Sequence, residues 1–552
     1  MLVAESLQPF LTSKVIHSTW AGTYRCRPQA YFQPRTLEEI RTLVNEARRQ
    51  GKTIMTVGSG HSPSDLTMTN EWMCNLDKFN KLVSTTEVRG PKSDGKGDEV
   101  KFVDLKVEAG CRVYELNKLL QDLNLAIQNL GSISDQSVAG LISTGTHGST
   151  QYHGLVSQQV VSIEIMNSAG ELVECSSVKN PDIFRAALLS LGKIGIICYV
   201  TLRTCPAYTI KSKQEIIKFD TLLDMWDSIW LDSEFIRIWW FPYTDKCVCW
   251  RASKSDEPLS APRPSWYGTW SGRLFYESLL WLSVHVAPWL TPHVERFVFS
   301  RQYGTVETIG YGAVAVQHSV DGLNMDCLFS QFVNEWSAPL IEGKEVLTKL
   351  KAAIKVAANN GDYYVHAPIE VRCSNVTYTD VPFEENGKPS LNPPQSWLAK
   401  RDRLSTGPIP GNNLRPYLDN SPVRPYSDKV TNEQLTLFIN ATMYRPFHTN
   451  VETREWYRIF ETVMADAGGK PHWAKNFIGL DGDHMTDASL RTQLGYGGEK
   501  FYAMDGFKPV MKDWFGENLV KYNQVRQKMD PDGVFSSGKS WAERNGIILD
   551  VE

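Results

Sequence analysis

The length, composition and charge of the chain set the first limits on its fold and partners. Its 552 residues, 42% apolar and 22% charged, match a folded globular protein and exceed one ordinary hydrophobic core, so we expect two closely packed domains. The formal net charge is -4 with both signs mixed along the chain, which disfavours nucleic acid as a partner. The ten cysteines include no C-x-x-C pair, which disfavours a zinc site or a disulfide framework and favours a reducing compartment.

The first third of the chain alternates helix and strand signals. Thr36 and Glu39 form a capping box, Gly51 marks a helix end, and apolar residues recur between them at helical spacing, namely Leu37, Ile40, Leu43, Val44 and Ala47. A short strand, 53–57, follows and runs into the loop Gly58-Ser59-Gly60-His61-Ser62-Pro63. Small residues let a ligand approach the backbone closely, so this loop is the first candidate site.

A second segment of small residues follows another strand and helix, which we expect at 103–109 and 113–120. Residues 131–149 are too rich in Gly, Ser and Thr for ordinary core, so we expect free backbone N–H groups there. A hairpin is expected at 160–166 and 172–175, then a helix from Asp182 and an apolar strand at 194–202. The first domain is expected to close near Cys205.

The sequence pattern changes after Pro206 to long strands rich in aromatic residues, such as 235–240, which indicates a second domain. Residues 374–430 are rich in Pro, Asn and Gly and predict a long surface excursion. A helix is expected at about 514–529, before an Asp530-Pro531-Asp532 turn.

One apolar segment, 274–290, raises the question of a membrane. It contains Glu277, His285 and Pro288, and a spanning helix needs about 20 apolar residues, so a span is disfavoured. A buried helix and a helix lying on a membrane surface both remain open. The N-terminus lacks the charged start and long apolar stretch of a secretory signal.

Two nucleotide-binding spellings lack the context that they need. Residues 533–540 match the P-loop pattern G-x-x-x-x-G-K-S, but they follow a predicted helix and a proline turn instead of a strand. Gly58-x-Gly60 lacks the third glycine of a Rossmann fingerprint because Pro63 occupies its place. Both observations disfavour these nucleotide sites.

His61 is either a polar surface residue or a functional one, and its loop alone leaves both readings open. Three stretches of small residues favour function, at 58–63, at 131–149 and at the Gly192-x-x-Gly195 turn. They offer separate places for the pyrophosphate, ribityl chain and adenine of a dinucleotide to contact backbone. This arrangement suits a flavin dinucleotide in size, although spacing alone does not single one out.

Polar residues also gather in two later segments. Alternation in 363–373 predicts His366, Glu370 and Arg372 on one strand face, opposite Val365, Ile369 and Val371. The pair Glu370 and Arg372 is either a surface ion pair of little consequence or a site that orients a polyol. Residues 468–475, Gly-Gly-Lys-Pro-His-Trp-Ala-Lys, form either an ordinary basic turn or part of a site.

Together, the segments 58–65, 131–149, 370–372 and 472–475 resemble the aldonolactone oxidases, flavoproteins of the vanillyl-alcohol-oxidase type. The resemblance covers nearly the whole chain, including 304–333 and 435–446. It implies a two-domain α+β flavoprotein: an FAD-binding domain over 1–205 with a C-terminal return at about 500–552, and a substrate cap domain over 206–499. It also implies a mitochondrial setting at the outer membrane, with possible membrane association through 274–290.

The resemblance assigns roles to individual residues. His61 matches the histidine that carries FAD covalently, whereas relatives without it bind FAD noncovalently. The other implied FAD contacts are Gly58, Ser59, Gly60, Ser62, Ser137, Gly140, Thr144, Gly145, Thr146, His147, Gly192, Gly195, Ile197 and Lys475. Glu370, Arg372 and Lys475 match the catalytic residues beside the flavin; no metal is implied.

The implied reaction is oxidation of a sugar lactone at C2, with molecular oxygen as the acceptor and hydrogen peroxide as the product. Some relatives pass electrons to cytochrome c instead. Two other classes stay open, a P-loop nucleotide hydrolase and a non-catalytic module that binds a lactone or a flavin. Bound flavin would exclude the first class, and bleaching of that flavin by a lactone would exclude the second.

Overall fold

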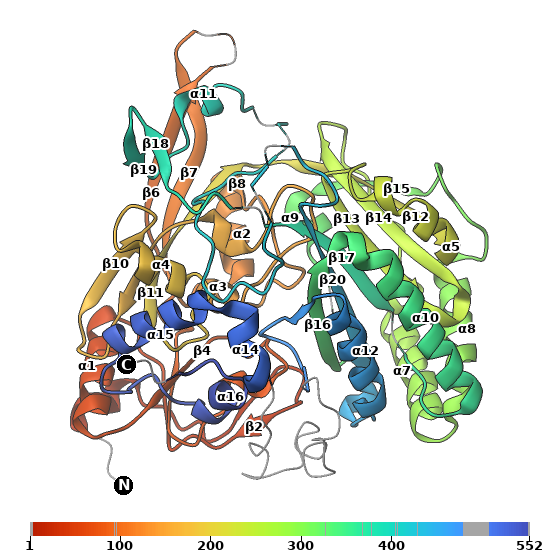
Figure 1. The fold of residues 1–552 in the computed structure, drawn as a ribbon, viewed down its shortest axis with the longest axis horizontal. Coiled ribbons are helices and arrows are strands. Elements are labelled where there is room, and N and C mark those ends of the chain that lie inside the picture. The colour runs from red at the N-terminus through yellow and green to blue at the C-terminus, as the bar shows by residue number, and fades with distance from the viewer. Residues whose placement is uncertain are drawn as a thin grey trace.

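A computed structural model describes residues 4–478 and 507–549, apart from positions 93, 95, 326, 367, 377, 403, 406, 425 and 428. The side chains of Pro509, Lys539 and Ser540 are not described either. The first third of the chain and its C-terminal helices lie together, and most of the middle of the chain forms the other half of the molecule (Figure 1). Both halves combine helices with sheets, so the predicted α+β class is confirmed.

A three-stranded parallel sheet lies near the N-terminus, in the order β3 (Ala30–Phe32), β5 (Trp72–Asn75) and β4 (Ile54–Val57). Helix α1 (Leu37–Arg49) connects β3 to β4. The Thr36 side chain accepts a hydrogen bond from the Glu39 N–H at 3.2 Å, and the apolar face of α1 is buried. The predicted helix and strand are therefore confirmed, and the 58–63 loop begins where β4 ends.

A six-stranded antiparallel sheet forms the rest of the first half. Its order is β10 (Leu172–Ser176), β9 (Val160–Met166), β11 (Ile196–Pro206), β7 (Asp98–Glu108) and β6 (Leu82–Pro91), with β8 (Leu125–Ala126) paired to β11. The same half of the molecule contains the helices α2 (Val113–Asp122), α3 (Val138–Ser143) and α4 (Pro181–Ala187). The predicted β9–β10 hairpin is confirmed. The chain leaves this sheet at β11, and the next strand belongs to the other half.

The C-terminal helices pack on the first half of the molecule. They are α14 (Lys508–Phe515), α15 (Glu517–Met529) and α16 (Lys539–Arg544). The Tyr522 hydroxyl donates to the Ser190 carbonyl at 2.6 Å, and Arg544 pairs with Asp65 at 3.1 Å. The stretch with the P-loop spelling follows α15 rather than a strand, so it lacks the strand that a P-loop needs. The predicted return partly lies outside the described residues.

An eight-stranded antiparallel sheet forms the second half. Its order is β15 (Ala313–His318), β12 (Thr209–Lys218), β14 (Lys246–Ser255), β13 (Phe235–Phe241), β17 (Ile369–Asn375), β20 (Leu435–Tyr444), β16 (Gln331–Pro339) and β21 (Lys470–Pro471). Helices α10 (Gly343–Asn360) and α12 (Arg454–Asp466) pack against each other, and α12 also packs on β16 (Figure 1). The central strands β17, β20 and β16 are almost completely buried.

The apolar segment 274–290 lies in a helical hairpin of α7 (Trp270–His285), a short turn at Pro288–Leu290, and α8 (Thr291–Tyr303). Only Tyr276, Leu280 and Ser283 of α7 are buried, which disfavours the buried helix, one of the two alternatives that the sequence left open. Large apolar side chains are exposed instead, including Trp270 at 80%, Phe275 at 50% and Trp289 at 62%. None of the described helices is long and apolar enough to cross a membrane.

The expected surface excursion at 374–430 is only partly correct. Its first part contains β18 (Phe383–Glu385), β19 (Lys388–Ser390) and α11 (Gln395–Leu398), which lie beside the β6–β7 hairpin that projects from the molecule (Figure 1). Residues 409–421 return to the interior, where the Asn412 side chain donates to the carbonyls of Ser157 and Val160. Composition predicted neither these short elements nor the burial of 409–421, where side-chain hydrogen bonds satisfy backbone carbonyls.

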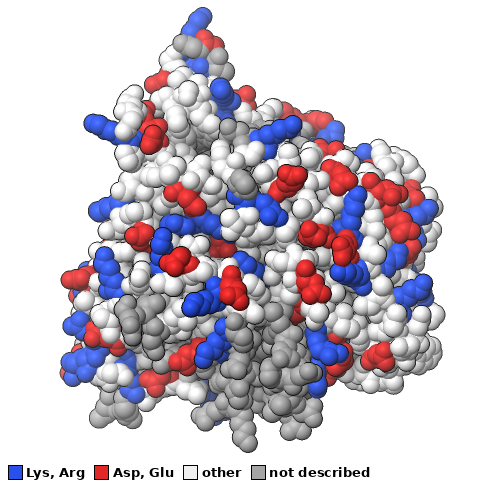
Figure 2. All heavy atoms as spheres, in the orientation of Figure 1, with Lys and Arg blue, Asp and Glu red and all other residues white. Residues whose placement is uncertain are grey.

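Acidic and basic side chains are mixed on the face of the molecule seen in Figure 2, and this face carries no large region of one charge. This pattern agrees with the small net charge of -4. All ten cysteines are free.

Candidate active site

Two cavities meet at His61. The first, which we call the charged pocket, contains the side chains of Glu335, Glu370, Arg372 and Lys475. The second, which we call the glycine-lined cavity, follows the 58–62 loop, the start of α3 and the Gly192–Gly195 turn. His61, Ser62 and Gln136 line both cavities. A ligand that filled the second cavity would therefore reach the first one at His61.

The 58–63 loop depends on two glycines. A Cβ atom at Gly58 would lie 2.3 Å from the Ser137 Oγ, which is too close for any side chain. Gly60 has φ +71°, a conformation that favours glycine. The loop thus packs closely against Ser137, the N-cap of α3, at Gly58, and against Ser18 at Gly60.

His61 is held by its ring. The imidazole stacks on Trp20 with ring centroids 5.2 Å apart, and its Nε2 lies 3.6 Å from Asp135. Nδ1 is buried and has no hydrogen-bond partner in the described part of the chain. Burial lowers the pKa of His61 to about 4, although Asp135 opposes the shift, so the ring is neutral near pH 7. A neutral imidazole with an unpartnered nitrogen is suited to bonding with a ligand.

The glycine-lined cavity brings together the predicted cofactor residues from three segments. Ser59 lies on the first loop, Ser137, Gly140 and Thr144 lie at α3, and the third segment contributes Gly192, Gly195 and Ile197. A Cβ atom at Gly195 would lie 2.5 Å from the Met166 carbonyl, so only glycine fits there. Loops shaped by missing side chains around one elongated cavity fit a dinucleotide such as FAD.

Three other predicted contacts lie elsewhere. Thr146 and His147 line the charged pocket instead of the glycine-lined cavity. The Gly145 carbonyl accepts a hydrogen bond from His472 Nε2 at 3.1 Å. The 131–149 segment therefore divides between the two cavities, with α3 at one and the residues after it at the other.

The charged pocket is built on one row across the eight-stranded sheet. Glu370 on β17 and Glu335 on β16 are both register partners of Asn440 on the intervening strand β20. Trp239 on β13 is the register partner of Glu370 on its other side. All four residues line the pocket, since register partners share a face of a sheet.

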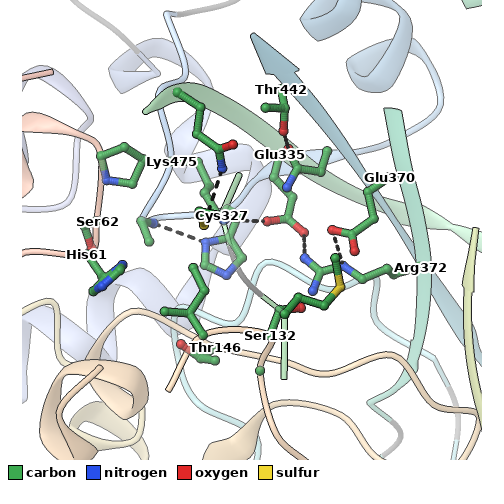
Figure 3. A pocket seen from close by; sticks show the side chains of 18 of the residues that line it. His61, Ser62, Ser132, Thr146, Cys327, Glu335, Glu370, Arg372, Thr442 and Lys475 are labelled. Atoms are coloured by element: carbon green, nitrogen blue, oxygen red, sulfur yellow. Dashed lines mark hydrogen bonds and ion pairs between the residues drawn. The ribbon is translucent and has the colours of Figure 1, made fainter. Parts of the chain in front are cut away.

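Glu335 is the centre of the ion pairs in this pocket. Its side chain is fully buried and bonds Arg372 Nη2, while Lys475 Nζ lies 3.1 Å and His147 Nε2 3.2 Å from the carboxylate (Figure 3). Burial alone would raise the pKa of Glu335, but Arg372 and Lys475 outweigh burial and hold that pKa well below its usual range. The carboxylate is ionised at neutral pH.

Glu370 and Arg372 are not a surface ion pair. Arg372 is buried, and its Nε lies 3.4 Å from the Glu370 carboxylate. Burial lowers the pKa of Arg372, but Glu335 and Glu370 outweigh this effect and raise it. One oxygen of Glu370, Oε1, is buried without a hydrogen-bond partner in the described residues. The pair therefore faces the pocket with an unused acceptor.

His366 does not join this face, so that part of the alternation prediction is wrong. Strand β17 begins at Ile369, and His366 precedes it in irregular backbone. Its Nε2 bonds the Tyr444 carbonyl at 2.8 Å, and the side chain does not line either cavity. Regular alternation cannot be extended past the end of a strand.

Three side chains at this cluster are of the kinds that bind metal ions. His147, Glu335 and His472 offer ligand atoms within 4.8 Å of one another. However, Arg372 and Lys475 already neutralise the carboxylate, and they would repel a metal cation. Both ring nitrogens of His472 are bonded, one to the Gly145 carbonyl and one to the Ala474 N–H. The described geometry favours an ion-pair network over metal coordination.

The sequence analysis did not identify Glu335 or Asn440. Both lie inside apolar strands whose neighbours are known only from the folded sheet. The available signal was the charge of Glu335 within the stretch 332–338, which is otherwise free of charged residues. Charged residues are almost never fully buried unless they are paired, so such a position is a candidate functional residue.

Comparison with known proteins gives matches over the full length. The family model for D-arabinono-1,4-lactone oxidase matches residues 200–545, and the model for an FAD binding domain matches residues 28–176. The chain is 70% identical to D-arabinono-1,4-lactone oxidase of Candida albicans, over 99% of this chain and 100% of that protein. The enzymes of the same name from Debaryomyces hansenii (100% and 99% of the two chains) and Saccharomyces cerevisiae (97% of each) are 69% and 47% identical.

Solved structures show the same fold at low sequence identity. Cholesterol oxidase from Brevibacterium sterolicum has a TM-score of 0.69 at 15% identity, and the match covers 97% of each chain. A solvent-stable cholesterol oxidase has a TM-score of 0.68, also at 15% identity, over 98% of each chain. Together with the FAD binding domain model, these matches confirm the flavoprotein fold that was predicted. The chain belongs to the D-arabinono-1,4-lactone oxidase family, and its first third matches the FAD binding domain.

Proposed function

We propose that this protein is an FAD-dependent oxidase of D-arabinono-1,4-lactone and related aldonolactones, including L-gulono- and L-galactono-1,4-lactone. The products are D-erythroascorbate and ascorbate-type enediols, and oxygen is reduced to hydrogen peroxide. The observation that carries the proposal is the charged pocket, which adjoins the glycine-lined cavity at His61 in a member of this family.

FAD would occupy the glycine-lined cavity and reach the charged pocket at His61. The three loops described above would hold the dinucleotide, and Lys475 would face it from the other side of the junction. We propose that His61 carries FAD covalently through the 8α-methyl carbon, because its ring is neutral and its Nδ1 is unpartnered in the described residues. When bound, FAD supplies the two-electron redox chemistry by accepting hydride from C2 of the lactone.

The residues of the charged pocket bind the lactone and move its proton. Glu370 Oε1 accepts the proton of the C2 hydroxyl, since this oxygen has no other partner in the described residues. Arg372 pairs with Glu370 and orients the lactone, and Lys475 contributes a second fixed positive charge. Oxidation at C2 yields a 2-keto lactone, which then enolises to the enediol.

The proposal is tested by the colour of the purified protein. After acid precipitation the pellet should keep a flavin spectrum, and anaerobic D-arabinono-1,4-lactone should bleach the native protein. A colourless protein would contradict the proposed FAD site. A yellow protein that no aldonolactone bleaches would instead be a non-catalytic binding module.

The exposed face of the helical hairpin supports a further proposal about location. We propose that α7 and α8 lie on a membrane surface, in keeping with the mitochondrial outer-membrane setting implied by the resemblance. Trp270, Phe275, Trp281 and Trp289 expose between 37% and 80% of their area on this hairpin. Aromatic side chains suit the membrane interface because one end is apolar and the other tolerates water.

A further inference from the structure

Glu335 joins two cations that come from distant parts of the chain. Arg372 lies on β17, and its guanidinium reaches across β20 to the Glu335 carboxylate on β16. Lys475 lies in the loop after β21 and approaches the same carboxylate, with Nζ 3.1 Å away. Two unscreened positive charges in a buried pocket repel each other, and one shared anion removes this repulsion.

The backbone around Lys475 is fixed independently of the Glu335 side chain. The His472 N–H donates to the Glu335 main-chain carbonyl at 2.8 Å, and the Asn476 N–H donates to the Val333 carbonyl at 2.7 Å. The Asn476 side chain also donates to the Pro63 carbonyl at 2.7 Å. A change of the Glu335 side chain therefore leaves this loop attached to β16 and to the loop of His61.

The contacts of Glu335 also affect Glu370. Arg372 directs Nη2 to Glu335 and only Nε toward Glu370, at 3.4 Å. Without Glu335, the whole guanidinium would be available to Glu370 and would occupy the oxygen that is now unpartnered among the described residues. Glu335 thus competes with Glu370 for the same arginine.

We propose that Glu335 is a positioning residue: its carboxylate holds Arg372 and Lys475 at fixed places in the charged pocket and leaves one oxygen of Glu370 free for the substrate. The proposal rests on the proposed function. It concerns side chains that act on the lactone, and it assigns Glu335 no contact with the reacting atoms.

The test compares Glu335 with a similar residue outside the pocket. Glu215 on β12 is also buried and pairs with an arginine, Arg251, and a lysine, Lys213, at the far side of the same sheet. Glu335→Gln and Glu215→Gln should both lower the melting temperature. Only Glu335→Gln should lower kcat, on the order of a hundredfold, because misplacement of oriented groups has effects of this size.

Three readouts separate positioning from stability. Glu335→Gln should keep its FAD but show a changed visible spectrum. Glu215→Gln should keep both its FAD and the wild-type spectrum. Glu335→Asp, which keeps the charge, should recover part of kcat. In Glu335→Ala, added formate should restore turnover in a saturable way, because it can replace the missing carboxylate; Glu215→Ala should not respond.

Wild-type kcat, KM and spectrum in Glu335→Gln would overturn the proposal. If Glu335→Gln does not fold, Glu335→Ala with formate decides, and turnover that formate leaves unchanged would overturn the proposal equally. Failure of the proposed function looks different, because then the wild-type protein itself would not be bleached by any aldonolactone.

Discussion

Arg372 pairs more closely with Glu335, two strands away in the sheet, than with Glu370, two residues away in the sequence. The pocket therefore contains two carboxylates with different surroundings. Glu335 is enclosed by cations. Burial alone would raise the pKa of Glu335, but the cations outweigh burial and hold that pKa well below its usual range. Oε2 of Glu335 and Oε1 of Glu370 both lack a hydrogen bond in the described residues, but Lys475 Nζ lies 3.1 Å from the Glu335 oxygen, whereas the ion pair of Glu370 with Arg372 uses its other oxygen. This difference favours Glu370 over Glu335 as the group that takes a proton from the substrate.

Replacement of Glu370 or Arg372 by alanine should slow the reduction of bound FAD by lactone while FAD stays bound. The expected loss is on the order of a hundredfold or more, since an oriented charge is removed. Anaerobic stopped-flow absorbance measures this step directly. Arg251→Ala, which removes a half-buried arginine from a distant ion pair, serves as the control and should reduce at the normal rate. Near-normal reduction in Glu370→Ala would remove Glu370 from the mechanism.

In His61→Ala, the flavin should become extractable by acid, because the ring that would carry it is absent. The wild-type pellet should remain yellow under the same conditions. His153→Ala is a suitable control, as His153 is buried but lines neither cavity. Flavin that stays with denatured His61→Ala would show that another residue carries it.

The local parts of this site could be predicted from the sequence. The Thr36 cap, strand β4 and the glycine loop after it depend on neighbouring residues and occur where expected, although the Glu39 side chain accepts from the Arg35 N–H and does not complete a capping box. The glycines at 58, 192 and 195 indicated a cavity: a Cβ atom at Gly58 or Gly195 would come within 2.5 Å of a neighbouring atom, and Gly192 has φ +70°, a conformation that favours glycine. Such signals involve residues close together in the sequence, so they can be recognised without knowledge of the fold.

The rest of the site depends on pairing between distant strands. Glu335 and Glu370 become neighbours only because β20 lies between their strands. Strand order is not encoded in local spacing, so the sequence suggested Glu370 with Arg372 and missed the carboxylate that binds the arginine more closely. The prediction for His366 was wrong for a related reason. Alternation holds only within a strand, and His366 lies before β17, which begins at Ile369.

Glu295→Gln should stabilise the protein at neutral and mildly alkaline pH. Burial raises the pKa of Glu295 to about 8, although the Tyr243 N–H donates to it at 2.7 Å. From the normal carboxyl pKa up to about 8, the unfolded chain releases this proton and the folded chain keeps it, so stability falls as pH rises. Glutamine removes this loss, which is on the order of 2–5 kcal/mol.

The measurement is urea unfolding at pH 5 and at pH 8. The gain in Glu295→Gln should be small at the lower pH and large at the higher one. Glu215→Gln provides a control of opposite sign, because net attraction to Arg251 and a hydrogen bond from Gly310 lower the pKa of Glu215 in spite of burial. Equal effects of both substitutions at both pH values would contradict the assignment.

Replacing Trp270, Phe275 and Trp281 with serine should weaken binding to vesicles of mitochondrial outer-membrane lipids. These side chains are exposed, so their loss should leave folding and flavin content unchanged. Leu280 belongs to the same segment but is only 2% exposed, and Leu280→Ser is the matched control for lost packing. Vesicle flotation measures the binding. Unchanged flotation of the triple variant would remove α7 as the membrane surface.

Molecular oxygen should be the electron acceptor, with hydrogen peroxide as its product. Oxidation of each lactone leaves two electrons that an acceptor must remove, and the ten cysteines show no spacing of an iron–sulfur ligand set. Gly58-x-Gly60 also lacks the third glycine of a nicotinamide fingerprint, because Pro63 takes its place. Oxygen needs no site of either kind, whereas a protein acceptor such as cytochrome c would need a docking surface close to the flavin.

The test is stopped-flow reoxidation of lactone-reduced enzyme in aerated buffer, with peroxide measured against lactone consumed. Peroxide near one per turnover supports an oxidase, and slow reoxidation with fast electron transfer to cytochrome c would establish a dehydrogenase instead.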